Sequence, residues 1–146
     1  MNLELKTSTV INATPKQVWD VFTQFDKMEE RGYFVSHISG EMKEGNKINI
    51  TAGGMQFKPL LLSYKPEKEL IWLGNFLIKG LFDGKHQFYL VDNGNGTTTF
   101  HQNESFSGIL VRLFKGGLLS KTKLGFEDMN AKLKNFVENL QLVNIT

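Results

Sequence analysis

The longest alternating stretch of the chain predicts a β-hairpin. From Lys85 to Asp92 and from Thr97 to Ser107, the residues follow the two-residue period of β-strands. Asn93-Gly94-Asn95-Gly96 stands between the two segments, and tight hairpin turns prefer asparagine and glycine. The sequence therefore predicts two long antiparallel strands joined by this turn.

The register expected for the hairpin places a histidine opposite a glutamate. If Leu90 lies opposite Phe100, His86 lies opposite Glu104, because paired positions step by two along each strand. This face also carries Gln102 and is otherwise apolar, with Phe82, Phe88, Leu90, Phe100 and Phe106. The opposite face is expected to be solvated and carries Lys85, Gln87, His101 and Asn103.

Two short helices are expected after a first strand at Asn2–Asn12. Thr14-Pro15-Lys16-Gln17 combines a capping threonine, a proline at the first helical position and a glutamine three residues after the cap. One helical face then carries Val18, Val21, Phe22 and Phe25. Asp26-Lys27-Met28-Glu29 repeats the capping pattern, which predicts a second short helix ending near Gly32.

The middle of the chain reads as a meander of antiparallel strands. Glycine and proline separate segments that are rich in apolar and β-branched residues. The strands are expected at Tyr33–Ser39, Asn46–Ala52, Met55–Tyr64 and Leu70–Ile78, followed by the hairpin.

The last third of the chain changes to a helical period. Apolar residues recur at spacings of seven, three, four, three and four in the series Leu119, Phe126, Met129, Leu133, Phe136 and Leu140. The opposite side carries Asp128, Lys132, Asn135 and Asn139. An amphipathic helix over 118–140 would run about 34 Å at ~1.5 Å per residue, enough to cross a sheet. A curved sheet that grips this helix is the arrangement expected.

Composition limits the class of protein. A chain of 146 residues and 16.6 kDa fits one domain, 1–146. Lysine and arginine total 17 against 15 acidic residues, a surplus too small to argue for nucleic acid binding without a clustered basic patch. Cysteine is absent, which excludes disulfides and thiolate metal sites. No signal peptide or apolar run of ~20 residues stands out, so a cytoplasmic location is expected.

Ordered motifs connect the chain to a known superfamily. They are Ile11-Asn12-Ala13-Thr14-Pro15, Val18-Trp19, Glu69-Leu70-Ile71-Trp72, Gly80-Leu81-Phe82-Asp83-Gly84-Lys85-His86-Gln87-Phe88, Thr99-Phe100, Glu104-Ser105-Phe106-Ser107-Gly108 and Gly125-Phe126-Glu127-Asp128-Met129-Asn130. With the element order, they resemble the START-like (SRPBCC) superfamily and its bacterial polyketide-cyclase-like branch over nearly the whole chain. One departure is Glu30-Arg31-Gly32-Tyr33, where many relatives have a tryptophan.

The resemblance implies an α+β helix-grip fold. A curved antiparallel sheet of about seven strands would wrap around the long C-terminal helix, with two short helices after the first strand. A hydrophobic cavity would lie between the sheet and the helix.

The leading functional hypothesis is binding or transport of a small hydrophobic ligand or lipid. Its apolar body would contact Trp72, Phe88, Phe100, Phe126, Met129 and Leu133. Its polar end would be held by His86, Gln102 and Glu104. Two structural alternatives stand beside this hypothesis: the apolar residues form ordinary core, and the His86/Glu104 pair only braces the hairpin.

Two further hypotheses remain open. In a cyclase or dehydratase, Glu104 would take a proton from an acidic carbon while His86 polarises or protonates the oxygen. In a protein-interaction module like the chaperone activators of the superfamily, the basic and apolar segment 109–126 would dock the partner. The same segment also fits transient contact with an anionic membrane, or a solvated helix face.

No cofactor or metal is expected. The three histidines, His37, His86 and His101, lack the spacing of metal ligands. Gly94-Asn95-Gly96 lies in a hairpin turn and not between a strand and a helix, so it is no phosphate loop. The sequence indicates no particular oligomeric state.

Overall fold

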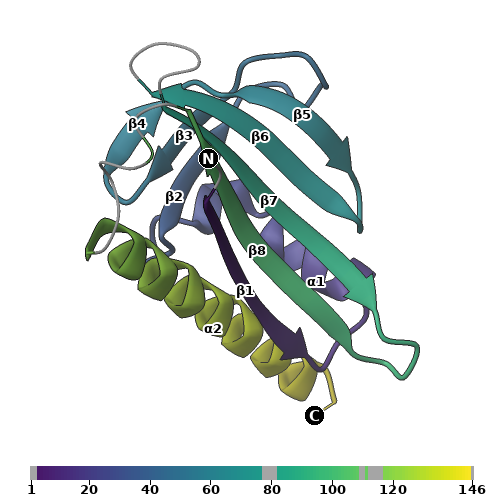
Figure 1. The fold of residues 1–146 in the computed structure, drawn as a ribbon. Coiled ribbons are helices and arrows are strands. Elements are labelled where there is room, and N and C mark those ends of the chain that lie inside the picture. Colours follow the sequence, from purple (N-terminus) through teal and green to yellow (C-terminus); the bar gives the residue numbers. More distant parts are fainter. Residues whose placement is uncertain (1–2, 77–81, 109–110, 112–116, 146) are drawn as a thin grey trace.

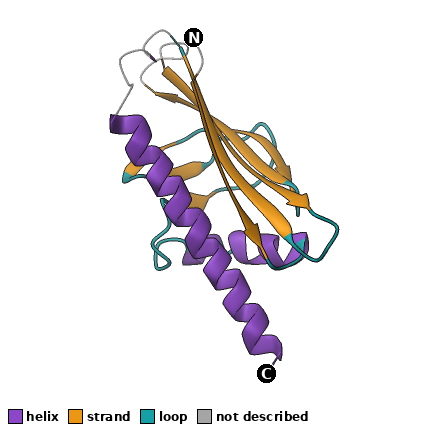
Figure 2. Ribbon diagram, turned by 60° about the horizontal axis from the view of Figure 1, so that its bottom comes forward, coloured by secondary structure: helices purple, strands orange, loops and turns teal. Residues whose placement is uncertain are grey.

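A computed structural model describes residues 3–76, 82–108, 111 and 117–145 of the chain (Figure 1). Its elements in chain order are β1 (Leu3–Ile11), α1 (Pro15–Phe22), the 3-10 turn η1 (Phe25–Lys27), β2 (Val35–Ser39), β3 (Asn49–Ala52), β4 (Met55–Phe57), β5 (Leu60–Lys65), β6 (Glu69–Phe76), β7 (Phe82–Asp92), β8 (Thr98–Ser107) and α2 (Gly117–Ile145). Helix α2 lies along the curved strands (Figures 1 and 2). The expected α+β helix-grip arrangement is confirmed.

The strands form two hydrogen-bonded groups that adjoin each other. One has the order β1-β8-β7-β6-β5 and the other β2-β3-β4, and all pairs are antiparallel. A bridge between Lys47 and Leu60 links the groups. The Ile48 amide also donates to the Pro59 carbonyl at 3.0 Å. The curved sheet therefore continues from one group into the other.

The segment expected as a single strand, Met55–Tyr64, is divided. Its first residues form β4 in the smaller group and its last form β5 in the larger one. Pro59 stands at the division. Proline has no N–H to donate to a ladder and restricts the residue before it, so the strand breaks there and changes sheet.

Helix α1 begins where the capping pattern predicts. The Gln17 amide donates to Thr14 Oγ1 at 3.3 Å, and the Thr14 amide donates to Gln17 Oε1 at 2.9 Å. The second short helix is only the 3-10 turn η1, and no side chain caps it. The expected capping residue, Asp26, lies inside this turn. The chain then continues in turns to Gly32, whose φ of 71° suits glycine.

Helix α2 buries a stripe that differs from the expected one. Phe126, Met129, Leu133 and Val137 are buried, whereas Phe136 and Leu140 are 39% and 43% exposed. The expectation that these last two face the sheet was wrong. A straight helix drifts against a seven-residue repeat, so the buried row moves from position 136 to position 137. The C-terminal end of α2 also reaches past the strands (Figure 2).

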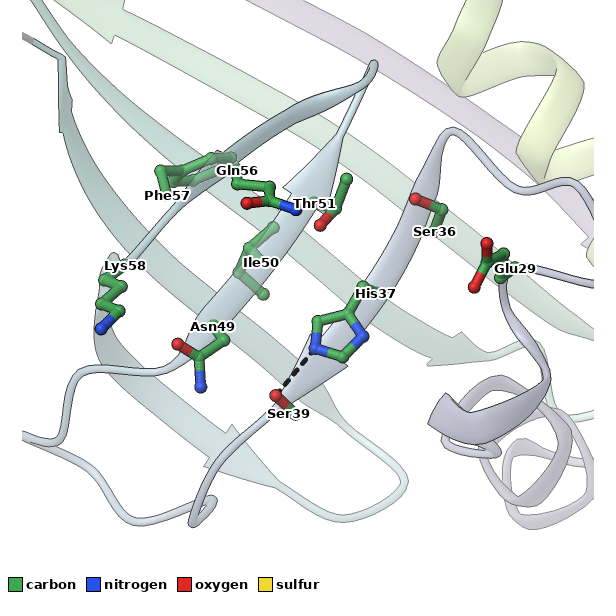
Figure 3. A pocket seen from close by; sticks show the side chains of 10 residues that line it. All are labelled: Glu29, Ser36, His37, Ser39, Asn49, Ile50, Thr51, Gln56, Phe57 and Lys58. Carbon is green, nitrogen blue, oxygen red and sulfur yellow. Dashed lines mark hydrogen bonds between the residues drawn. The ribbon is translucent and has the colours of Figure 1, made fainter.

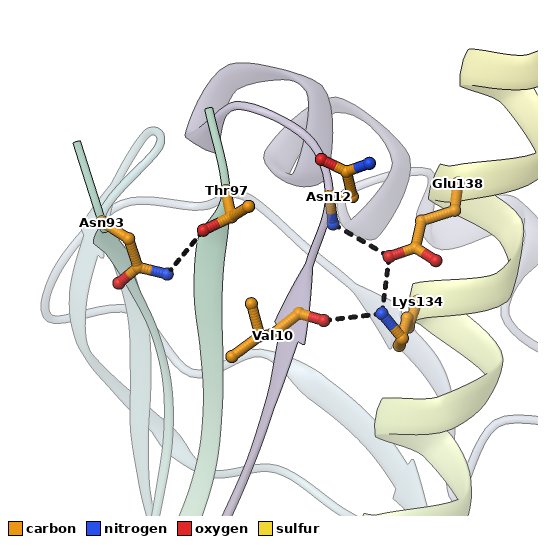
Figure 4. Close-up of polar contacts among 6 residues, drawn as sticks. All are labelled: Val10, Asn12, Asn93, Thr97, Lys134 and Glu138. Carbon is orange, nitrogen blue, oxygen red and sulfur yellow. Dashed lines mark hydrogen bonds and ion pairs between the residues drawn. The ribbon is translucent and has the colours of Figure 1, made fainter. Parts of the chain in front are cut away.

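Helix α2 supplies polar partners to the edge strand β1. Lys134 Nζ donates to the Val10 carbonyl at 2.7 Å, and the Asn12 amide donates to Glu138 Oε2 at 2.9 Å (Figure 4). Lys134 and Glu138 are also paired at 2.6 Å. The hydrogen bonds from Lys134 and from the Asn12 amide lower the pKa of Glu138. Side chains of the helix thus take the place of a neighbouring strand at this end of β1.

Candidate functional site

The hairpin of β7 and β8 has the expected register. Leu90 pairs with Phe100, Phe88 with Gln102 and His86 with Glu104. At the turn, Asn93 Nδ2 donates to Thr97 Oγ1 at 3.0 Å (Figure 4). The prediction that a histidine lies opposite a glutamate on the apolar face is confirmed.

The His86 imidazole lies in an aromatic enclosure. Its ring stacks on Trp72, with centroids 4.7 Å apart and an interplanar angle of 22°. Phe88 and Phe126 contact it from other directions, at 4.6 and 4.9 Å between centroids. Three aromatic rings from β6, β7 and α2 therefore surround this polar side chain.

Glu104 lies in the same enclosure, and one of its carboxylate oxygens lacks a hydrogen-bond donor among the described residues. His86 Nδ1 and Glu104 Oε2 are 3.1 Å apart, with side-chain exposures of 4% and 10%. Their contact lacks the alignment of a hydrogen bond, and no described residue donates one to Glu104 Oε2. A buried carboxylate oxygen without a donor carries a desolvation cost that a polar partner would relieve.

A chain of buried hydrogen bonds continues from His86 to β1. His86 Nε2 contacts Gln102 Oε1 at 3.1 Å, and Gln102 Nε2 donates to Asn130 Oδ1 at 2.9 Å. Asn130 Nδ2 donates to Thr7 Oγ1 at 2.9 Å. The Thr7 hydroxyl then donates to the Gln102 carbonyl at 2.6 Å. Side chains from β7, β8, α2 and β1 are thus joined in one network.

The network contains two residues that the sequence analysis did not select, Thr7 and Asn130. Asn130 is four residues after Phe126 and three before Leu133, so it falls on the buried stripe of α2. A polar residue at an apolar position of a helical period is a signal that could have revealed it. Thr7 lies in a strand with imperfect alternation and offered no comparable signal.

The residues expected to contact the apolar body of a ligand are close-packed. Trp72, Phe88, Phe100, Phe126, Met129 and Leu133 are each exposed by 1% or less. A water-sized void against these side chains would leave accessible surface on them. In this conformation, a ligand would therefore have to displace side chains to reach His86.

Phe34 closes the space between α2 and the turn that joins β3 to β4. Its half-buried ring contacts Phe126, with centroids 5.4 Å apart. A Cβ at Gly125 would lie 2.3 Å from this ring, and a Cβ at Gly53 2.9 Å from it. The ring is therefore seated between two glycines. From the protein surface inward, the Phe34 ring contacts Phe126, and Phe126 contacts His86.

Gly125→Val is expected to lower the free energy of unfolding by about 1–3 kcal/mol, because the new side chain would expel the Phe34 ring. Chemical denaturation measures this loss. Ala131→Val, at an exposed position of the same helix, controls for the helix propensity of valine. In a Phe34→Ala background, Gly125→Val should cost no more than Ala131→Val, because glycine is a poorer helix former than alanine. An unchanged difference between them would contradict the seating of Phe34.

An open groove of ≈ 750 Å³ lies elsewhere, over the β2-β3-β4 group (Figure 3). It is lined by Glu29, Ser36, His37, Ser39, Asn49, Ile50, Thr51, Gln56, Phe57 and Lys58. His37 Nε2 lies 2.8 Å from Ser39 Oγ. The lining includes none of the site residues expected from the sequence.

Tyr33 occupies the position of the sequence departure noted above. Its side chain is buried, and its hydroxyl has no hydrogen-bond partner among the described residues. Burial raises the pKa of this hydroxyl, an effect that nearby Arg31 opposes. The Arg31 guanidinium donates to the Val21 carbonyl and lies 4.7 Å from the centroid of the Phe136 ring.

Much of the basic segment 109–126 falls on residues 109–110 and 112–116, which lie outside the described part of the chain. Lys121, Lys123 and Leu124 are described and exposed, Leu124 by 66%. None of the described helices has the length and apolar character needed to cross a bilayer. Within the same ranges, no three histidine, cysteine or acidic side chains are grouped as a metal site would require.

Comparisons with known proteins agree with this architecture. A family model described as "Polyketide cyclase / dehydrase and lipid transport" matches residues 2–141. No curated protein sequence matches the chain. Protein MLL2253 from Mesorhizobium loti has a TM-score of 0.67 at 21% identity, over 94% of this chain and 98% of its own.

Two other solved structures have the same fold at lower identity. Hypothetical protein jhp0584 from Helicobacter pylori has a TM-score of 0.75 at 13% identity, over 92% of this chain and 88% of its own. Norcoclaurine synthase from Thalictrum flavum, solved in complex with dopamine and hydroxybenzaldehyde, has a TM-score of 0.69 at 12% identity, over 95% of this chain and 88% of its own. At these identities, the likeness shows the fold alone.

Proposed function

Because the chain belongs to the polyketide cyclase/dehydrase and lipid transport family, we propose that it binds a small hydrophobic molecule or lipid that carries a hydrogen-bond donor. One observation carries this proposal: Glu104 Oε2 is buried on an aromatic face without a hydrogen bond from a described residue. A hydroxyl group of a ligand would supply the missing donor. Hydrogen bonds to a charged acceptor are among the stronger ones in proteins.

The ligand would enter where two aromatic rings separate the site from solvent. Phe34 is half-buried and contacts Phe126, which in turn contacts His86. An outward swing of Phe34 would leave the space beside Gly125 and allow Phe126 to turn away from the imidazole. The apolar body would then lie against Trp72, Phe88, Phe100, Met129 and Leu133, with its hydroxyl at Glu104.

The first test is native mass spectrometry of the gently purified protein, followed by solvent extraction and identification of any bound molecule. Hydrophobic phenols then serve as probes, each paired with its O-methyl ether, which has the same shape but no donor. We take 1-naphthol and 1-methoxynaphthalene as the first pair. Binding is followed by titration calorimetry.

Glu104→Gln is expected to weaken binding of the phenol by about 10- to 100-fold, because the charge-assisted hydrogen bond is lost while the shape is kept. Binding of the methyl ether should change little. Glu127→Gln makes the same substitution at an exposed position of α2 and serves as the control. If the phenol and the ether bind equally well to the native protein, Glu104 does not select a donor.

The contact between His86 and Glu104 favours a second candidate, cyclisation or dehydration of a polyketone-like substrate. Glu104 would remove a proton from an acidic carbon, and His86 would protonate or polarise the carbonyl oxygen that receives the charge. Single-turnover assays with β-polyketone surrogates test this candidate. Turnover that survives Glu104→Gln would remove this residue from the chemistry.

A further inference from the structure

We infer that Asn130 is a positioning residue that fixes which nitrogen of His86 carries a proton. The inference concerns the ligand-free network, and only its consequence for ligand choice rests on the function proposed above. Each group in the hydrogen-bond chain from Thr7 to His86 has a fixed role as donor or acceptor, and these roles determine the proton position on His86.

The backbone carbonyl of Gln102 sets the direction of the chain. A carbonyl only accepts hydrogen bonds, so the Thr7 hydroxyl, 2.6 Å away, must donate its hydrogen to this carbonyl. Thr7 Oγ1 is then an acceptor for its other neighbour, Asn130, at 2.9 Å. The Asn130 amide must therefore turn its NH2 group toward Thr7 and its oxygen toward Gln102.

The hydrogen-bond order continues from Asn130 to His86. The Asn130 oxygen accepts from Gln102 Nε2 at 2.9 Å, and the Phe126 carbonyl lies 3.5 Å from the same nitrogen. Two acceptors thus hold the NH2 group of Gln102 on the side of α2. Its oxygen consequently faces His86 Nε2 at 3.1 Å, and that nitrogen must carry a proton.

Fixing the proton on Nε2 decides what the site offers a ligand. His86 Nδ1 is then the nitrogen that faces Glu104 Oε2, 3.1 Å away. Both ends of the Gln102 amide are occupied within the network, so this side chain orients His86 and does not hold the ligand. The polar end of the ligand therefore meets Glu104, an acceptor, which selects hydroxylated hydrophobic molecules over molecules that only accept.

Nitrogen-15 NMR of the ligand-free protein tests the inference. Native protein should show the proton of His86 on Nε2, protected from exchange with water. Asn130→Leu and Thr7→Val each remove one link of the chain. Both should raise the exchange rate of this proton by about 10-fold, because the Gln102 amide is then free to turn.

Two conservative variants separate positioning from general loosening. Asn130→Asp keeps an acceptor for Gln102, and Thr7→Ser keeps the hydroxyl, so both should retain the native Nε2 proton signal and most of its protection. A native proton on Nδ1, or equal protection in all four variants, would overturn the inference. Ligand titrations are separate measurements, so failure of the proposed function and failure of this inference are distinguishable.

Discussion

His86→Leu is expected to lower the free energy of unfolding by about 3–5 kcal/mol, among the largest effects of any single substitution in this chain. The substitution leaves the buried Glu104 carboxyl group without the imidazole that lies 3.1 Å from it. It also leaves Gln102 Oε1 without its donor. Urea denaturation followed by circular dichroism measures the loss.

Adding Glu104→Leu should restore most of that stability, because two apolar side chains can fill the space of a buried polar pair at little net cost. His101→Leu is the control, since His101 is half-buried on the opposite face and stacks on Tyr89. It should cost about 1 kcal/mol or less. If the double variant is as unstable as His86→Leu alone, the two side chains are not coupled. A double variant more stable than the native protein would instead show that the pair is retained at a cost to stability.

Phe88→Ala is expected to cost a similar amount, about 3–5 kcal/mol. The side chain is fully buried, and its ring lies within 4.7 Å of Phe22 and 5.6 Å of Trp72 between centroids. Truncation would leave an apolar cavity beside His86. Thermal and urea unfolding measure the loss, and Phe136→Ala at a partly exposed position of α2 is the matched control.

The cavity left by Phe88→Ala also has a chemical readout. Apolar cavities of this size stay dry and can take up benzene, which would then stabilise the variant in proportion to its occupancy. The native protein should gain nothing from benzene at the same concentration. Stabilisation of both proteins would show that an apolar space near this ring already exists. Stability of Phe88→Ala equal to that of Phe136→Ala would contradict the close packing of the aromatic face.

The hairpin could be derived from the sequence because its information is local. A turn of alternating asparagine and glycine fixes where the strands reverse, and the two-residue period fixes which face each side chain joins. Pairing of His86 with Glu104 follows from these two facts without knowledge of the rest of the fold. The aromatic surroundings of the two side chains could not be derived from the hairpin alone, because they include rings that come from β6 and α2.

The buried stripe of α2 could be derived only in part. The first turns that cross the sheet follow the expected pattern at Phe126, Met129 and Leu133. Further along, Val137 is buried where the pattern favoured Phe136, and the Phe136 ring lies under Arg31 instead. By this point a straight helix has drifted against the seven-residue repeat, so position 137 takes the buried place that the repeat assigned to position 136.

Asn130 shows a different limit of sequence reasoning. Asparagine in a helix is usually solvated, and only its distant partners Thr7 and Gln102 make burial acceptable here. Similarly, Met55–Tyr64 reads as one strand until Pro59 is seen to pass the chain from one sheet to the other. The break at Pro59 is a local signal, because proline interrupts a strand, whereas the change of sheet and the burial of Asn130 depend on contacts between segments far apart in the chain.

The side chains of α2 that complete β1 also bear on how the protein would aggregate. With Lys134 on the Val10 carbonyl and Glu138 on the Asn12 amide, these two backbone groups are not available to pair with another molecule. If the last turns of α2 came away, that edge would be open, and it belongs to a strand rich in threonine, valine and isoleucine. Aggregation would then start from a partly opened molecule with an intact sheet, and its rate would follow fraying of the C-terminal helix more closely than global unfolding.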